Sequence, residues 1–217
     1  MSKNFAFTLA EVLITLGIIG IIAAMTIPTV ITNYKKQEVQ TKLSKIYSVM
    51  NEAIRQSELE NGNIIEWDWT LSHFAPYQKQ LEWYNKYLSK YIKINKIENI
   101  ISKNNANVLT IYFADGSILY TNWGDMNDFS FFINKKAMKN GKVGKDIFFF
   151  RLKPKSNSIY HKNKYFEPFA ETWDGNINHL YQNAPNNYGC ADQYGNFCTK
   201  IIQLNGWKIP KDYPIKF

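Results

Sequence analysis

The sequence predicts an α+β protein in which a long N-terminal α-helix, membrane-spanning in its first half, packs on a small antiparallel β-sheet head. Three observations lead to this fold class: an almost uninterrupted apolar run near the N-terminus, a one-sided helical pattern directly after it, and two β-rich runs joined by a tight turn. The 217 residues, of which 45% are hydrophobic, suit one domain with an appended segment or two small domains.

The apolar run extends from Phe7 to Ile31 and contains one charged residue, Glu11. Since about 20 apolar residues in a helix cross the hydrocarbon core of a bilayer, residues 12–31 alone are long enough to span it. A cleaved secretory signal is the competing interpretation. The leader MSKNFA is too short for such a signal, the apolar run is too long, and the following TIPTVITNYKK lacks a good cleavage site. We therefore expect a membrane helix.

The chain after Pro28 changes from apolar all round to amphipathic. Its apolar residues recur three or four positions apart: Val39, Leu43, Ile46, Met50 and Ala53. The sequence NGN at 61–63 then places Gly62 where a helix C-cap favours glycine. We expect one helix over about residues 7–60, roughly 80 Å long, with a kink at Pro28, which lacks a backbone donor.

The strands of the head are predicted by two segments. The segment VLTIYFADGSILYTNW has two β-rich runs around Asp115-Gly116, which is typical of a hairpin, and DIFFFRL at 146–152 predicts a third strand. A helix is considered for two other segments. QLEWYNKYLSKYI at 80–92 has apolar residues at helical spacing, whereas CTKIIQLNGWKIP fits either a short helix or a further strand.

A family resemblance rests on residues 6–28, AFTLAEVLITLGIIGIIAAMTIP. This stretch resembles the N-terminal signature of type IV pilins and type II secretion pseudopilins, which have a short leader, a small residue, Phe-Thr-Leu-x-Glu and a long apolar helix. The resemblance implies that a prepilin peptidase cuts between Ala6 and Phe7 and that Phe7 is then N-methylated. Thr8, Glu11 and Pro28 match assembly positions of the family's helix.

Two departures from the family's pattern concern the leader. Ala6 stands where the family usually has glycine, although the residue is still small. Lys3 is the only basic residue of the leader, so counting positive charges does not fix the orientation of the helix. The resemblance covers roughly the first 30 residues.

The resemblance also implies a division of the chain and a location. Residues 1–6 would be a leader peptide, 7–31 a transmembrane and polymerisation helix, 32–62 its amphipathic second half, and 63–217 a globular head with a C-terminal disulfide loop. The protein would cross the bacterial cytoplasmic membrane once, with its head outside the cytoplasm, and then enter a pilus or pseudopilus.

Glu11 needs a physical explanation, because a carboxylate in hydrocarbon costs on the order of 2.5 kcal/mol or more. The α-ammonium that cleavage would expose on Phe7 is a natural partner. In staggered helices, Glu11 of one subunit could neutralise the terminus of its neighbour and fix the register between them. The alternative is a glutamate that lies at the membrane interface and snorkels into water.

The two cysteines, Cys190 and Cys198, are predicted to form one disulfide outside the cytoplasm. They enclose ADQYGNF, and pilins often close a C-terminal loop in this way. Three interpretations stay open at this point: a structural staple, a receptor-contacting loop, and a thiol or metal site. A metal site would need further ligands, and the three histidines are too scattered to supply paired ones.

No cofactor, metal or catalytic site is expected. The segment 133–150 resembles the loop in which related pilins bind Ca²⁺, but it contains five lysines and only one acid, Asp146. Because Ca²⁺ requires six to eight oxygen ligands, we reject a calcium site there. The chain has no G-x-S-x-G, H-E-x-x-H or phosphate-binding glycine motif, so an enzyme is not predicted.

Charge is unevenly distributed in a chain with 26 Lys and Arg against 18 Asp and Glu. Residues 135–164 contain ten basic residues and one acid, whereas 165–199 contain four acids and no Lys or Arg. Three interpretations are open: two solvated loops, complementary patches that guide assembly, and contact with nucleic acid. In the third, Phe148, Phe149, Phe150 and Tyr160 would supply stacking rings.

The sequence therefore predicts a structural filament subunit. Its partners would be other subunits, prepilin peptidase, the inner-membrane assembly machinery and membrane lipid. The alternatives are a minor or tip pilin for adhesion or DNA uptake, and a membrane-tethered binding protein that does not polymerise.

Overall fold

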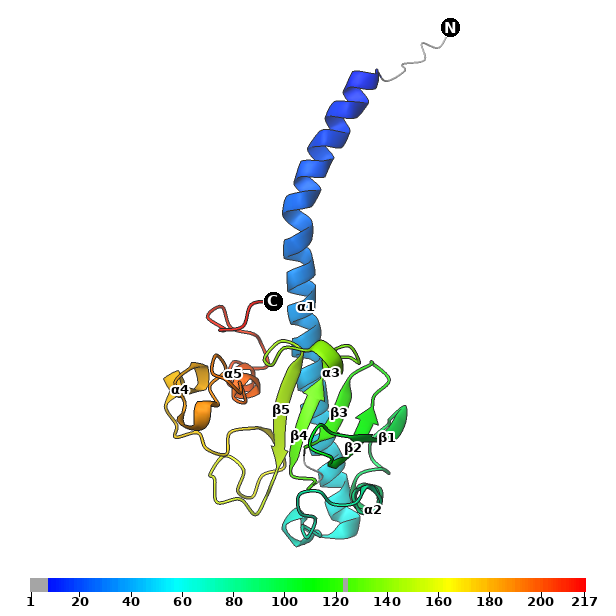
Figure 1. Ribbon diagram of the computed structural model, residues 1–217, viewed down its shortest axis with the longest axis vertical. Helices are drawn as coiled ribbons and strands as arrows, with labels where there is room; N and C mark the ends of the chain where they lie inside the picture. Colours follow the sequence, from blue (N-terminus) through cyan, green and yellow to red (C-terminus); the bar gives the residue numbers. More distant parts are fainter. Residues whose placement is uncertain (1–7, 123–124) are drawn as a thin grey trace. The chain divides into compact units, whose positions relative to one another are not determined.

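The computed structural model describes residues 8–122 and 125–217 (Figure 1). The chain divides into two compact units, residues 1–38 with Phe217 and residues Val39–Lys216. The long helix α1 (Leu9–Asn61) runs through the boundary between them. Ala6 and Phe7, the predicted cleavage site, lie outside the described residues.

The first unit consists of the apolar half of α1. The helix begins at Leu9 and continues through Pro28 without a break, which confirms the predicted long helix. Two threonine hydroxyls in the apolar stretch donate to backbone carbonyls of their own helix, Thr15 to Val12 and Thr26 to Ile22, each at 2.9 Å. These bonds satisfy polar groups that hydrocarbon would leave unsolvated.

The second unit is built on a six-stranded antiparallel sheet in which every strand pairs with its neighbours in the sequence. The strands are β1 (Lys96–Ile101), β2 (Asn107–Tyr112), β3 (Ile118–Thr121), β4 (Asp128–Phe132), β5 (Ile147–Leu152) and β6 (Phe166–Pro168). Register pairs such as Ile111 with Leu119 and Phe131 with Phe148 align large apolar side chains across neighbouring strands. This meander confirms the predicted α+β layout.

The second half of α1 lies along this sheet, as Figure 1 shows. The predicted apolar face is buried: Val39, Leu43, Ile46, Met50 and Ala53 are each at most 4% exposed. Asn51 adds a polar connection, because its side-chain amide donates to the Phe166 carbonyl at 2.9 Å and accepts from the Phe166 N–H at 3.2 Å. The helix is therefore fixed to the last strand of the sheet by both packing and hydrogen bonds.

The predicted hairpin is confirmed as β2 and β3. Its turn places Gly116 at φ +79°, a conformation that favours glycine, and the Asp115 carboxylate accepts the Ser117 N–H at 3.0 Å. The predicted strand at 146–152 is β5. Strands β1, β4 and β6 were not predicted, because KIENII and DFSFF mix polar and apolar residues and FEP is too short to show a pattern.

Short helices complete the head. They are η1 (Ile64–Glu66), α2 (Tyr77–Tyr87), α3 (Ala137–Asn140), α4 (Ile177–Tyr181), η2 (Pro185–Asn187) and α5 (Cys198–Leu204). Helix α2 confirms the predicted second helix, although it begins earlier and ends at Tyr87, where the chain turns. The segment CTKIIQLNGWKIP, predicted as either a short helix or a strand, forms the helix α5. It lies on β5, where the Phe149 N–H donates to the Thr199 hydroxyl at 3.1 Å.

Candidate functional site

The start of α1 is a closed capping box between Thr8 and Glu11. The Thr8 N–H and the Thr8 hydroxyl both donate to Oε2 of Glu11 at 2.8 Å, and the Glu11 N–H donates to the Thr8 hydroxyl oxygen at 3.2 Å. A Thr-x-x-Glu sequence at a helix start forms this reciprocal pair, which satisfies two backbone donors that the helix itself leaves unbonded. The spacing TLAE was available in the sequence but was not recognised there as a cap.

Glu11 retains bonding capacity beyond this turn. Both bonds from Thr8 reach Oε2, and no further bond to the carboxylate occurs among residues 8–122 and 125–217. Its second oxygen, Oε1, can therefore accept a donor from outside the turn. The carboxylate can serve its own helix start and a second, external cation at the same time.

The apolar part of α1 presents its side chains to the outside. No residue is buried in an 18-residue apolar window of this helix, and among the described residues it is the one helix long and apolar enough to cross a membrane. Leu13, Ile14 and Ile19 are each more than 60% exposed. Soluble proteins rarely leave so large an apolar surface uncovered, so lipid or other apolar helices are its expected surroundings.

Cys190 and Cys198 form a disulfide, with their Cα atoms 4.5 Å apart. This confirms the predicted pairing and makes the thiol or metal interpretation wrong, since both sulfur atoms are used. Both cysteines are buried, at 2% and 1% exposure. The bridge closes its loop from the interior of the head, at the first residue of α5.

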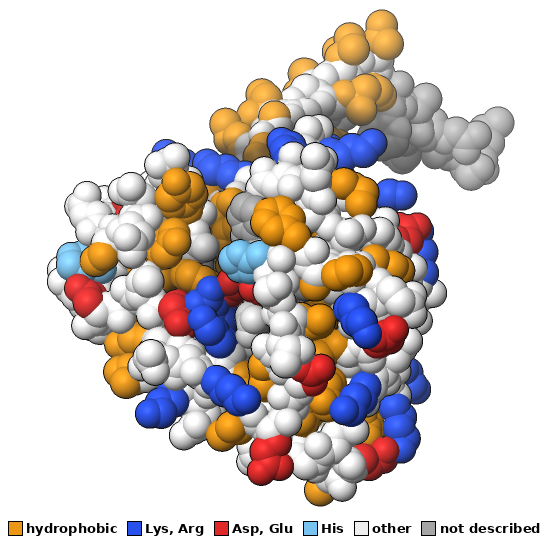
Figure 2. Space-filling model, turned by 60° about the horizontal axis from the view of Figure 1, so that its bottom comes forward, with side chains coloured by type: hydrophobic (Ala, Val, Ile, Leu, Met, Phe, Trp, Pro, Cys, Tyr) orange, Lys and Arg blue, Asp and Glu red, His pale blue; other side chains and the backbone are white. Residues whose placement is uncertain are grey.

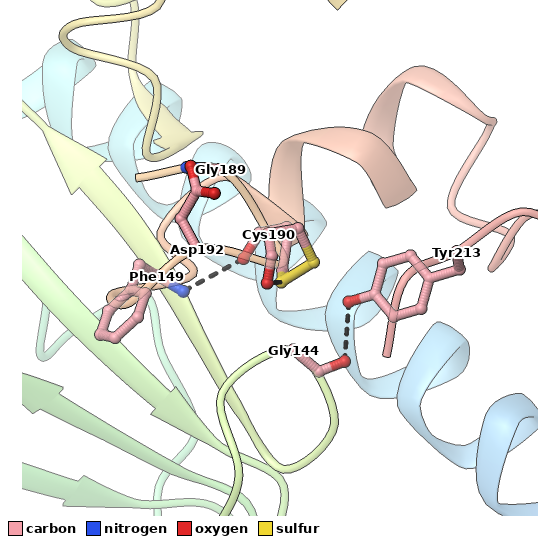
Figure 3. The surroundings of a disulfide bond; sticks show 8 residues. Gly144, Phe149, Gly189, Cys190, Asp192 and Tyr213 are labelled. Atoms are coloured by element: carbon pink, nitrogen blue, oxygen red, sulfur yellow. Dashed lines mark hydrogen bonds between the residues drawn. A yellow bond between two sulfur atoms is a disulfide. The ribbon is translucent and has the colours of Figure 1, made fainter. Parts of the chain in front are cut away.

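The surroundings of the disulfide depend on Gly144 (Figure 3). A Cβ at this position would lie 2.5 Å from Sγ of Cys198 and 2.8 Å from the Ile215 side chain. The residue also has φ +78°, and its carbonyl accepts the buried Tyr213 hydroxyl at 2.7 Å. Burial raises the pKa of Tyr213 well above its usual value, so the phenol remains a donor. The disulfide is thus packed between the 141–146 loop and the C-terminal segment.

The loop that the disulfide closes has a fixed base and an exposed tip. Asp192 accepts three backbone N–H groups, from Asn183 and Ala184 at 2.9 Å and from Gly189 at 3.0 Å. Tyr194 at the tip is 49% exposed. This arrangement supports the staple interpretation for the bridge, while contact of the tip with a receptor stays a prediction.

The structure divides the basic run 135–164 into two parts. Strand β5 separates residues 135–146 from 153–164 by six residues, about 20 Å along an extended strand. Two of the four rings proposed for stacking on nucleic acid, Phe148 and Phe150, are fully buried in the core. The run therefore does not form the single basic and aromatic surface that the nucleic-acid interpretation needs.

The four acids of 165–199 are each engaged within their own subunit. Glu171 bonds the Ser156 hydroxyl at 2.8 Å, Glu167 accepts the Tyr47 hydroxyl at 3.0 Å, and Asp174 contacts His179 at 2.7 Å. Asp192 holds the loop base described above. These contacts order the four acids without removing their charge, so complementary patches that guide assembly stay a prediction.

An ion cluster near the end of β5 was not predicted. Arg151 is half-buried, pairs with Asp128 and with Glu171 at 3.1 Å, and lies 4.6 Å from the centre of the Phe169 ring. Arg151 and Asp128 are opposite one another in the β4–β5 register, so the pair could be found only once β4 was known. These contacts connect β4, β5 and the 169–171 segment, which is a structural role.

His161 lies fully buried beside this cluster. Its Nε2 accepts the Ala170 N–H at 3.0 Å, which places the imidazole proton on Nδ1. Burial, together with the charge of Arg151, lowers the pKa of His161 to about 3. The side chain is therefore a neutral acceptor at neutral pH.

A pocket of about 470 Å³ lies between α1 and the 163–167 segment. Its polar walls bond to each other: Tyr165 donates to Glu58 at 2.5 Å, and Tyr47 donates to Glu167. Burial and the adjacent Glu167 raise the pKa of Tyr47 to about 12. These four groups bond one another, so none of them is left open to a ligand, while Arg55 and Lys164 also line the pocket.

Two family models match the chain. The one described as the prokaryotic N-terminal methylation motif matches residues 1–27, and the one described as a family of unknown function, DUF6613, matches residues 29–217. The first confirms the resemblance to the pilin and pseudopilin signature, which is that of a structural protein. No curated protein and no solved structure matches the chain.

Proposed function

Because the chain belongs to the DUF6613 family and carries the N-terminal methylation motif ahead of it, we propose that it is a structural subunit of a type IV pilus-like or pseudopilus filament. Prepilin peptidase would cut between Ala6 and Phe7. The apolar half of α1 would hold the subunit in the cytoplasmic membrane, with the head outside the cytoplasm. The same helix would later form the centre of the filament.

One observation carries this proposal: an exposed apolar helix begins at a capping box whose acid has one oxygen that no described residue bonds. A membrane anchor alone needs the apolar surface but not a carboxylate at its start. A packed array of identical helices uses both, since neighbours cover the apolar surface and the ammonium of Phe7 on one subunit can bond Oε1 of Glu11 on another. Such a pair fixes the stagger between helices.

The first test is the mass of the N-terminal peptide from protein purified out of its own host's membranes. The expected peptide begins at Phe7 and carries one added methyl group. Ala6→Leu should block cleavage because a bulky residue precedes the cut, whereas Ala6→Gly, its matched control, should be cut normally. A wild-type peptide that still begins at Met1 or Ser2, in a host with the peptidase, would leave a tethered binding protein as the remaining interpretation.

The second test asks whether the processed protein polymerises. Filaments sheared from the cell surface, or trapped in the cell envelope by cross-linking, should contain the mature chain. Processed protein that is recovered only as a membrane monomer would contradict the filament role while leaving the processing site intact.

A further inference from the structure

Lysines gather at the end of the head where the chain arrives from the apolar part of α1. The loop 133–146 and the C-terminal segment 208–216 together contain eight lysines and two aspartates. Seven of the eight are exposed, and we call them the collar lysines: Lys135, Lys136, Lys139, Lys142, Lys208, Lys211 and Lys216.

The two segments lie against each other and against the first turns of the head's helix. The Tyr213 hydroxyl joins them through the Gly144 carbonyl. Lys42 of α1 donates to the Ile133 carbonyl at 2.8 Å, and the Ile209 N–H donates to the Gln40 side chain at 2.7 Å. Both segments that carry the collar lysines therefore contact α1 just after Val39, the first residue of this unit.

The collar lysines have no ion-pair partner among the described residues, although Lys135 is near enough to Glu98 to help lower the pKa of that carboxyl. The carboxylate of Asp146 accepts the backbone N–H of Lys142 at 3.0 Å instead. Some lysines elsewhere on the head do pair with acids, as Lys79 does with Glu82 and Lys90 with Glu60. Figure 2 accordingly shows blue and red side chains interspersed over the face that comes forward.

We propose that the collar lysines bind the head groups of anionic phospholipids in the bilayer that α1 spans. The inference rests on the membrane insertion proposed above. Val39 lies eight residues after Ile31, the last of the apolar run, about 12 Å further along a continuous helix. Because the head-group layer extends about 5–7 Å beyond the hydrocarbon, roughly 5–7 Å of this length remains between the head groups and Val39, which is within the Debye length of about 8 Å at physiological salt. Basic clusters at such a distance are attracted to an anionic membrane surface.

The occupant is a lipid surface and not a nucleic acid, because the chain itself leads from the hydrocarbon to the collar. Within the two segments that carry the collar, the one aromatic ring, Tyr213, is buried, whereas single strands are usually bound by stacking on exposed aromatic rings. Head-group binding would hold the head on the membrane until the subunit leaves the bilayer.

The test uses the full chain in two kinds of vesicle, one of phosphatidylcholine alone and one that also contains 30% phosphatidylglycerol. Both kinds contain a trace of lipid with a nitroxide on its head group, which quenches a nearby fluorophore. A fluorescent amino acid replaces the exposed Asn140 within the collar. We expect phosphatidylglycerol to increase quenching at least about twofold at low salt, and 0.5 M salt to remove the increase. The combined variant K135Q, K136Q, K139Q and K142Q should abolish it.

A matched control carries K103Q, K155Q, K162Q and K164Q, which remove four exposed lysines at the opposite end of the sheet. This variant should keep the full increase. Equal quenching in the two kinds of vesicle, or an equal loss in both variants, would overturn the inference. Duplex DNA tests the nucleic-acid alternative in phosphatidylcholine vesicles. If DNA bound the wild type but not the collar variant, and phosphatidylglycerol had no effect on quenching, the collar would be a nucleic-acid surface and the inference would be overturned.

Flotation of the vesicles separates this inference from the proposed function. Protein that fails to float with either kind of vesicle contradicts membrane insertion itself. Protein that floats with both, but shows no lipid-dependent quenching, contradicts only the role of the collar.

Discussion

Thr8 and Glu11 each donate a hydrogen bond to the other's side chain, so the apolar helix α1 begins at a closed capping box. The glutamate is thereby explained at two levels. Within one chain, it satisfies the backbone at the N-terminus of a helix whose first donors would otherwise meet hydrocarbon. Between chains, in the filament proposed above, its negative charge would pair with the ammonium of a neighbour. These two roles can be separated, because glutamine can replace glutamate in a capping box without carrying its charge.

The variant Glu11→Gln should therefore keep the capping box at the start of α1 but should not assemble into filaments. We expect the variant to be inserted and cleaved like the wild type, because the side-chain oxygen still accepts from Thr8. The yield of sheared filaments should fall at least tenfold, since the ammonium of a neighbouring Phe7 has lost its counter-charge. Glu11→Ala, which loses both functions, should assemble no better. If Glu11→Gln assembled normally while Glu11→Ala did not, the role of the residue would be capping alone.

The sequence was most informative where one local pattern decides one element. The apolar run and the spacing of Val39, Leu43 and Ile46 determine α1 and its buried face, and Asp115-Gly116 determines a hairpin. Strands β1 and β4 escaped prediction because their pattern is set by the partners they pair with. The environment of a lone His161 likewise depends on a segment, 169–171, that packs against it only in the folded chain.

The candidate site divides in the same way. Ala6, Phe7, Glu11 and the pairing of the two cysteines could be proposed from the linear order of residues. The separation of the basic run into two ends of the head could not, because it depends on the direction of β5. The burial of the disulfide could not be predicted either, since it results from the approach of Gly144 and the C-terminal segment.

Removing the disulfide should destabilise the head measurably. Closing a loop of about nine residues reduces the entropy of the unfolded chain by an amount worth roughly 2.5 kcal/mol. The double variant Cys190→Ala and Cys198→Ala should therefore unfold at a lower urea concentration than the oxidised wild type, measured on the full chain in detergent. Adding a reductant to the double variant is the control and should change nothing. An unchanged midpoint in the variant would mean that the bridge contributes no stability.

Gly144 should be far less tolerant of a side chain than Gly116. Both glycines have a positive φ, +78° and +79°, so alanine at either position costs about 1 kcal/mol of backbone strain. At Gly116 an added Cβ would have no neighbouring atom within 4 Å, whereas at Gly144 it would meet Cys198 and Ile215. Gly144→Ala should cost a further 1–3 kcal/mol, roughly, through overpacking.

The free energy of urea unfolding compares these two alanine variants directly. In a background that carries Cys198→Ala and Cys190→Ala, the extra cost at Gly144 should shrink, because the sulfur atom 2.5 Å away has been removed. Equal costs at the two glycines would show that the 141–146 loop can move away from the disulfide without loss.

His161 should make the head less stable as the pH falls from 6.5 towards 4.5. Its pKa is lowered to about 3 in the folded protein by burial, against about 6.5 in the unfolded chain. Between these values only the unfolded chain takes up the proton, so unfolding becomes more favourable as the pH decreases. We expect His161 to account for a loss of about 2 kcal/mol over this window. Carboxyl groups of lowered pKa, such as Glu171, add a smaller loss only towards pH 4.5, where their unfolded forms begin to take up protons.

The variant His161→Gln tests this explanation, because an amide oxygen can still accept the Ala170 N–H but does not titrate. Its free energy of unfolding, measured in urea at pH 6.5, 5.5 and 4.5, should depend on pH much less than that of the wild type. His179→Gln, which removes a partly exposed histidine beside Asp174, is the matched control and should keep the pH dependence of His161. A His161→Gln protein that lost as much stability as the wild type would place the acid sensitivity in another group.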